Sequence, residues 1–217
     1  MQSQTLSHQN LTRALQAAGR GVRPGELETC AHLMAWAFHD DPAIRYLLGG
    51  TDLGPEDWRY FYTVLRAVYG KCVLLSTDDR LENLLILFPP RLKSVPALAF
   101  FRRGGGKLWR HFGLGLYVRS LRYEAHCGRV REKCAPPEAW YCMCLVVSPE
   151  VQGRGQGSRL LKPALECLRR AGAPLYLETH KPVNTQIYAH LGFRQADVSA
   201  IPGTRVAQYA MLKPGTP

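Results

Sequence analysis

The chain has 217 residues, of which 46% are hydrophobic and 21% are charged, a composition typical of a soluble globular protein. This length predicts one domain with enough chain for a sizeable core. The formal net charge of +11 raises the question of nucleic-acid binding, but the basic residues are scattered along the chain, so we expect no nucleic-acid partner. No apolar run approaches the ~20 residues that a membrane span needs, and we expect no membrane partner.

Residues 1–22 contain no acidic residue and no continuous apolar stretch, so they do not resemble a signal peptide. We interpret them as a leader in front of a single domain over residues 23–217. The seven cysteines form an odd set without a C-x-x-C pair. This pattern predicts reduced thiols, a cytoplasmic location and no metal site.

In chain order, the apolar spacing predicts helices over residues 25–38, 42–48 and 55–69. The third of these presents a stripe of aromatic residues, which is typical of a core-facing helix. Asp40 and Asp41 lie between the first two helices. Aspartates at such a position are typical of a helix cap and a turn.

Residues 71–76 and 81–88 flank the turn residues Thr77-Asp78-Asp79-Arg80, which predicts a β-hairpin. Residues 92–133 predict two helices separated by the triple glycine 104–106, and we interpret this segment as a helical insertion. Two further strands are predicted near the end of the chain, over residues 194–198 and 205–212.

The most informative stretch begins with a predicted buried strand, Trp140 to Val147, with Cys142 and Cys144 on one face. A glycine-rich loop follows, Gln152-Gly153-Arg154-Gly155-Gln156-Gly157, and leads into a predicted helix over residues 158–171. A glycine loop before a helix N-terminus is suited to bind phosphate, because backbone N–H groups and the helix dipole point outward. Its spacing matches neither the P-loop nor the dinucleotide fingerprint.

A second strand is predicted over residues 175–179, followed by a short helix over residues 185–191 that Asn184 caps. Together these segments closely resemble the GNAT superfamily of acyl-CoA-dependent N-acetyltransferases. Its motif V-x-P-x-x-Q-G-x-G-x-G is present from Val147 to Gly157, and its later motif N-x-x-x-Y-x-x-x-G-F runs from Asn184 to Phe193. The run L-E-T-x-x-P-x-N resembles the branch that contains puromycin N-acetyltransferase.

The resemblance implies an α/β (α+β) fold, in which helices flank a mixed, mostly antiparallel central sheet. It also implies a V-shaped opening between the two central strands, with residues 92–133 on the acceptor side. The first two helices flank the acceptor pocket in this family, so Asp40 and Asp41 are also candidates to attract a cationic amine. Acetyl-CoA is the implied co-substrate. The implied cofactor-binding residues are Leu145, Val146, Val147, Gln152, Gly153, Arg154, Gly155, Gln156, Gly157, Ser158, Asn184 and Tyr188.

By the same resemblance, Tyr188 protonates the departing thiolate. Many family members carry a glutamate base on the central strand, whereas this strand has no carboxylate up to Cys144. Glu178 is the best remaining candidate for the base, followed by His180 and His126, and a chain of water molecules is an equal alternative.

These features predict an N-acetyltransferase that moves an acetyl group from acetyl-CoA to a primary amine of a small molecule, directly, in a ternary complex. A ping-pong route through Cys142 or Cys144 lacks a histidine partner pattern. The alternatives are acetylation of a peptide or protein amine, and a non-catalytic acyl-CoA-binding regulatory protein. The sequence is compatible with a monomer or a homodimer.

Overall fold

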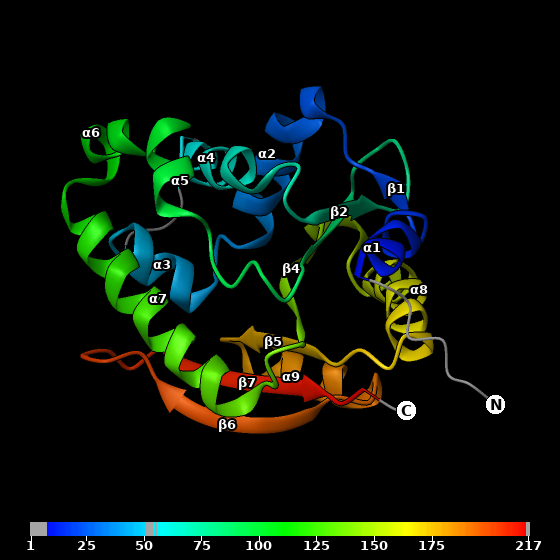
Figure 1. The fold of residues 1–217 in the computed structure, drawn as a ribbon. Helices are drawn as coiled ribbons and strands as arrows, with labels where there is room; N and C mark the ends of the chain where they lie inside the picture. Colours follow the sequence, from blue (N-terminus) through cyan, green and yellow to red (C-terminus); the bar gives the residue numbers. More distant parts are fainter. Residues whose placement is uncertain (1–7, 51–53, 55, 216–217) are drawn as a thin grey trace.

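The computed structural model describes residues 8–50, 54 and 56–215, and within them seven strands form one sheet in the order β1-β2-β3-β4-β5-β7-β6 (Figure 1). All neighbouring strands are antiparallel except β4 and β5, which are parallel. The strands are β1 (Arg20–Gly21), β2 (Val73–Ser76), β3 (Asn83–Phe88), β4 (Trp140–Val147), β5 (Leu175–Thr179), β6 (Arg194–Ala200) and β7 (Ala207–Lys213). The predicted mixed, mostly antiparallel sheet is confirmed.

Helices cover both faces of this sheet. Their bounds are α1 (His8–Gln16), α2 (Leu27–Ala37), α3 (Pro42–Leu48), α4 (Trp58–Val68), α5 (Ala97–Arg102), α6 (Trp109–Phe112), α7 (Gly115–Cys134), α8 (Gln156–Arg170) and α9 (Pro182–His190). Buried leucines of α1 and α8 form one apolar core with β2, β3 and β4. Helices α2 and α4 form a second core on the opposite face. In Figure 1, α1 and α8 lie at the right of the view, and α3 to α7 occupy the left and top.

The central strand β4 changes the side to which its residues point. Its register against β3 shifts between Ile86 and Leu87, so that Met143 is the extra residue of a β-bulge. Cys142 therefore packs in the core beside α8, whereas Cys144 packs in the core beside α2. The prediction that both cysteines share one face is wrong, because the bulge inverts the alternation between them.

The bulge lies where the sheet opens. Strands β4 and β5 pair at three positions, the last being Cys142 with Leu177, and both strands continue beyond it without pairing to each other. The edge of β4 that faces β5 is thus left without a strand partner from Met143 onward. This is the opening that the resemblance implied between the two central strands.

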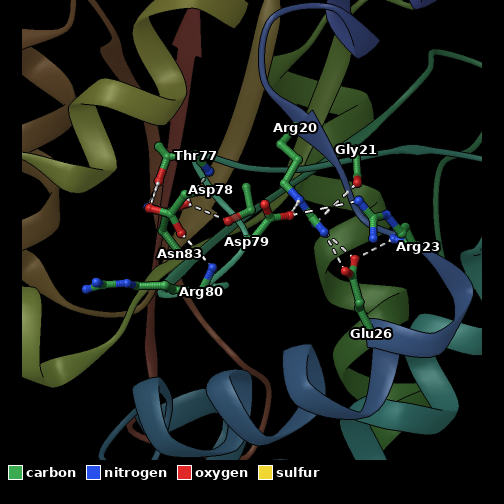
Figure 2. Close-up of polar contacts among 10 residues, drawn as sticks. Arg20, Gly21, Arg23, Glu26, Thr77, Asp78, Asp79, Arg80 and Asn83 are labelled. Atoms are coloured by element: carbon green, nitrogen blue, oxygen red, sulfur yellow. Dashed lines mark hydrogen bonds and ion pairs between the residues drawn. The ribbon is translucent and has the colours of Figure 1, made fainter.

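The N-terminal segment is part of the fold from His8 onward, which corrects the predicted leader over residues 1–22. Leu11 and Leu15 are 3% and 0% exposed in the core beside α8. Arg20 begins β1, which pairs with β2, and its guanidinium lies between Glu26 and Asp79 (Figure 2). The apolar face of α1 is short, so composition alone did not separate it from a leader. Residues 1–7 lie outside the described part.

Two other predictions differ from the structure. The insertion over residues 92–133 is helical, but it contains α5, α6 and the long α7 rather than two helices. Helix α9 starts at Pro182 with Lys181 as its N-cap, so Asn184 lies in the first turn and is not the cap. Proline needs no N–H at the first helical position and starts the helix earlier than predicted. Pro163 is contained within α8, which continues through it.

Candidate functional site

Two adjoining hollows lie where β4 and β5 separate. The central cavity is bounded by α2, α3, α4 and α7 together with β4 and β5, and its lining includes Met34, Phe38, Asp41, Tyr60, Phe61, Tyr123, Glu124, Arg131, Tyr141, Leu145, Glu178, His180, Asn184 and Tyr188. The glycine-loop groove lies on the outer side of the same opening. Its lining includes Phe38, Asp41, Leu145, Val146, Val147, Gln152, Gly153, Gly155, Gln156, Gly157, Ser158, Asn184 and Tyr188.

The structure therefore brings the residues of the predicted cofactor site together in one groove, with one exception. Arg154 is exposed and does not line the groove. Leu145 is the point at which β4 enters both hollows. The sequence motif thus identified a continuous surface that runs from the end of β4 to the first turn of α8.

The glycine loop has the backbone geometry of an anion site. Gly153 and Gly155 have φ angles of +77° and +75°, a region that residues with a Cβ rarely adopt. Gly155 is the N-cap of α8, a helix of 15 residues, so the first N–H groups of α8 have no acceptor within the helix. Gln152 donates from Nε2 to the carbonyl of Val147 at 3.0 Å and ties the loop to β4. This arrangement fits the pyrophosphate of coenzyme A.

Tyr188 stands between the two hollows, since it lines both. Its ring packs edge-on against Phe193, with 5.6 Å between the ring centroids. Burial raises the pKa of the Tyr188 hydroxyl well above its ordinary value, and the neighbouring cysteines add to the effect. The phenol is therefore protonated at neutral pH and is available as a donor.

Asn184 also lines both hollows, but part of its hydrogen-bonding capacity is already used. Its Nδ2 donates to Oγ1 of Thr179 at 3.0 Å, which joins the first turn of α9 to the end of β5. Asn184 thus holds α9 against β5 and keeps Tyr188 at the opening.

Glu178 does line the central cavity, but its surroundings argue against the predicted role of base. Its Oε2 accepts from the hydroxyl of Tyr141 at 3.1 Å, and its Oε1 accepts from the hydroxyl of Tyr176 at 3.1 Å. Arg131 lies 3.4 Å from Oε1, and only 2% of the Glu178 side chain is exposed. Burial raises the pKa of Glu178, and these partners offset part of the effect. A carboxylate so enclosed is suited to hold Arg131 rather than to meet a substrate.

Glu124 is the carboxylate that sequence reasoning missed. It lies on α7 and lines the central cavity, and it has neither a hydrogen bond nor an ion pair with any described residue. Loss of hydration within the cavity walls raises the pKa of Glu124 to about 7, Arg131 opposes the shift, and the nearby charge of Glu178 adds to it. The residue nevertheless remains accessible from the cavity. Its only signal in the sequence is that it is acidic within a basic insertion.

The two candidate histidines differ in position. His180 lines the central cavity, and its Nε2 is buried without a hydrogen-bond partner among the described residues. Burial lowers the pKa of His180, so the ring is neutral at pH 7. His126 does not line the cavity: it is 6% exposed and hydrogen-bonds through Nε2 to Ser199 at 3.2 Å. The prediction of His126 as a candidate base is therefore wrong on position.

The aspartates before α3 have separate tasks. Asp41 caps α3 by accepting from the N–H groups of Ala43 and Ile44 at 2.9 and 3.1 Å. Asp40 pairs with Lys181 at 2.5 Å, which lowers the pKa of Asp40. Of the two readings made from the sequence, the capping role of Asp41 is confirmed.

The buried thiols beside the cavity are poor nucleophiles. Burial raises the pKa of Cys142 to about 12 and places that of Cys144 well above its ordinary range. The thiolate, which is the reactive form, is therefore scarce at neutral pH. In the part of the chain that the structure describes, no cluster of three or more His, Cys, Asp or Glu side chains could hold a metal ion. Likewise, no described helix is long and apolar enough to cross a membrane.

Comparison with known proteins agrees with this geometry. The family model for the GNAT acetyltransferase domain matches residues 116–195. An uncharacterised N-acetyltransferase of Schizosaccharomyces pombe is 36% identical over 55 residues, which are 25% of this chain and 22% of that protein. The aligned part thus spans about a fifth of the length of that relative.

Solved structures share the fold over nearly the whole chain. A Corynebacterium glutamicum structure titled histone acetyltransferase HPA2 and related acetyltransferase has a TM-score of 0.61 at 18% identity, covering 91% of this chain and 95% of that one. The Drosophila melanogaster polyamine N-acetyltransferase, which forms N-acetylagmatine, has a TM-score of 0.54 at 18% identity, covering 89% and 97%. The narrower likeness to the puromycin branch stays a prediction. The glycine loop and the opened sheet lie within the matched segment, so residues 116–195 are similar to the GNAT acetyltransferase domain, and the chain shares its fold with solved acetyltransferases.

Proposed function

We propose that this protein transfers an acetyl group from acetyl-CoA to the primary amine of a small molecule, directly, within a ternary complex. The observation that carries the proposal is the junction of the two hollows at Leu145, Asn184 and Tyr188. A cofactor held by the glycine loop would reach this junction along the unpaired edge of β4. An amine in the central cavity would approach it from the other side.

Acetyl-CoA supplies a thioester to this site when it is bound. The N–H groups from Gly153 to Ser158 would hold its pyrophosphate, and the backbone from Leu145 to Val147 would pair with its extended arm. A backbone N–H of that segment would polarise the carbonyl of the thioester. Tyr188 would donate its proton to the sulfur of the departing thiolate, consistent with the raised pKa of its hydroxyl.

Glu124 is the group that we assign to the proton of the amine. Of the three carboxylates that line the cavity, Glu178 lies beside Arg131 and Asp41 accepts two backbone N–H groups. Glu124 has neither kind of partner among the described residues, and an ammonium ion would be attracted to it. A pKa of about 7 lets it accept a proton at neutral pH, as a general base requires. His180 is less suited, because its free nitrogen Nε2 is closed off from solvent. Glu178, which the sequence suggested as the base, would instead hold the guanidinium of Arg131 in place.

A small acceptor fits the cavity better than a peptide does. The cavity is walled by aromatic side chains from two helices, among them Tyr60, Phe61 and Tyr123, and a peptide needs an open groove. The similarity in fold to the polyamine N-acetyltransferase agrees with a small amine. Protonated cysteines at the cavity favour direct transfer over a covalent cysteine intermediate.

The test is thiol release from acetyl-CoA by the full chain, measured against a panel of small amines and lysine peptides, with cofactor binding followed by calorimetry. Amine-dependent release with a small molecule supports the proposal. Release with peptides alone would reassign the acceptor class. Cofactor binding without release on any amine would favour a non-catalytic acyl-CoA sensor, and absence of binding would refute the assignment of the glycine loop.

A further inference from the structure

The helical insertion exposes an unusual share of the apolar side chains. Six of the ten large apolar side chains that lie exposed in the described residues belong to α5, α6, α7 and the turns between them. We call this surface the insertion face and define it by Leu98, Phe101, Trp109, Leu114, Val118 and Leu121. Leu98, Leu114 and Leu121 are 71%, 70% and 73% exposed. Such concentrations of exposed apolar side chains mark interaction surfaces.

Contacts between the helices join these residues into one surface. Leu114, Val118 and Leu121 follow the helical spacing of i, i+4 and i+7 and form a stripe along the start of α7. Tyr117 lies beside this stripe and stacks on Phe101 of α5, with 5.6 Å between the ring centroids. Its hydroxyl accepts from the backbone N–H of Trp109 at 3.2 Å. Figure 1 shows α5, α6 and the start of α7 gathered at one end of the molecule.

The same segment is strongly and uniformly basic. Residues 97–123, which contain α5, α6 and the start of α7, include six arginine or lysine residues and no aspartate or glutamate. Arg102, Arg103, Lys107, Arg110 and Arg122 are exposed. Basic side chains around exposed apolar ones are the combination that binds anionic lipid surfaces.

A cationic hollow adjoins the insertion face. It lies between α4 and α5, and its lining includes Arg66, Lys71, Arg102 and Arg103 but no acidic residue. Leu98 lines the same hollow, so apolar surface and cationic surface meet there. A lipid phosphate could occupy this hollow while Leu98 enters the layer beside it.

We propose that the insertion face docks on an anionic membrane surface, with its apolar side chains in the headgroup boundary and its arginines against lipid phosphates. A second copy of the chain fits less well, because a symmetric contact would bring two groups of like charges together. A nucleic-acid partner would explain the exposed arginines, but it would not explain the exposed apolar side chains of Leu114, Val118 and Leu121. The inference does not depend on acetyl transfer, and it revises the expectation from sequence that no membrane is involved. Docking of this kind requires no membrane-spanning helix.

The test is flotation of the full chain with vesicles of phosphatidylcholine alone or of phosphatidylcholine with phosphatidylserine. We expect binding to the anionic vesicles, little binding to the neutral ones, and loss of binding at high salt. Each neutralised cation near the surface should weaken binding by roughly fivefold, so Arg102→Gln with Arg103→Gln should weaken it by roughly 25-fold. Leu114→Ser with Leu121→Ser should weaken it by about tenfold.

Matched controls are Val198→Ser and Arg194→Gln on β6, outside the insertion face, which should leave binding unchanged. Equal binding by the wild type and the double-leucine variant would reduce the effect to charge alone and overturn the proposal. Failure of the wild type to bind anionic vesicles would also overturn the proposal. So would a wild-type dimer that the leucine substitutions dissociate, if no vesicle binding is seen. A third such result would be binding to RNA that persists in the leucine variant. The comparison of the two vesicle types uses the wild type and needs no variant.

Discussion

Arg131 on α7 lies 3.4 Å from Glu178 on β5, measured from Nη2 to Oε1, and their side chains are 13% and 2% exposed. The guanidinium also lies over the ring of Tyr141, with 3.9 Å from Cζ to the ring centroid. This contact fastens the insertion to the central sheet at the wall of the cavity. With Glu178 held by Arg131 and Asp41 held by the backbone N–H groups of α3, Glu124 is the cavity carboxylate left without either kind of partner among the described residues.

Removing one partner of this buried ion pair should lower the stability of the protein. In Glu178→Ala, Arg131 keeps a buried charge without its partner, and we expect the free energy of unfolding to fall by about 3–5 kcal/mol. Replacing both residues, as Arg131→Met with Glu178→Leu, should cost less. Urea denaturation measures both variants. The control is Glu166→Ala at an exposed ion pair on α8, where the loss should stay below about 1 kcal/mol. A similar small loss in Glu178→Ala would contradict the assignment.

Tyr188→Phe should separate catalysis from binding. The variant keeps the ring packing against Phe193 but loses the proton donor, so kcat should fall by roughly 10²–10⁴-fold. The affinity for coenzyme A should change little, as measured by calorimetry. Tyr209→Phe on β7, which lines neither hollow, is the matched control and should keep full activity. Unchanged kcat in Tyr188→Phe would remove Tyr188 from the mechanism.

The role of Glu124 should be visible in the pH dependence of activity. A base must be deprotonated to act, so kcat/KM should rise with pH and level off above pH 7, since the pKa of Glu124 is about 7. Glu124→Gln should abolish this rise and lower kcat/KM. Because the pKa of Glu124 is raised in the folded protein, ionisation opposes folding above its ordinary pKa. The variant should therefore unfold no earlier than the wild type at pH 8.

Glu132→Gln is the matched control on the same helix, outside the central cavity, and it should retain the profile of the wild type. A pH profile that persists unaltered in Glu124→Gln would assign the proton transfer to another group. In that case His180 would be the next residue to replace.

The glycine loop can be tested by adding a single methyl group. Gly155→Ala places a Cβ at a φ of +75°, which should lower the free energy of unfolding by about 1–2 kcal/mol and weaken binding of coenzyme A. Gly128→Ala on α7 is the control. Its φ is not positive and a Cβ there meets open space, so we expect equal or slightly greater stability and unchanged binding. Equal stability of Gly155→Ala and the wild type would contradict the left-handed conformation.

The local sequence pattern determined part of the structure of this protein. The bounds of β4 and β5 follow from continuous apolar runs that end at turn residues, and the structure confirms both. The glycine loop follows equally from sequence, because positive φ angles at Gly153 and Gly155 are a property of single residues. These segments lie close together along the chain, so their order alone indicated the resemblance to the GNAT superfamily and the position of the groove.

Tertiary structure decided the rest. The bulge at Met143 depends on the pairing of β4 with β3. The charge of Glu178 is balanced by the guanidinium of Arg131, which lies 47 residues away in the sequence. The accessibility of Glu124 and the enclosure of His180 likewise depend on how α7 packs against the sheet. Hydration and charge pairing set the chemistry of a carboxylate, and both are properties of neighbours that local sequence does not specify.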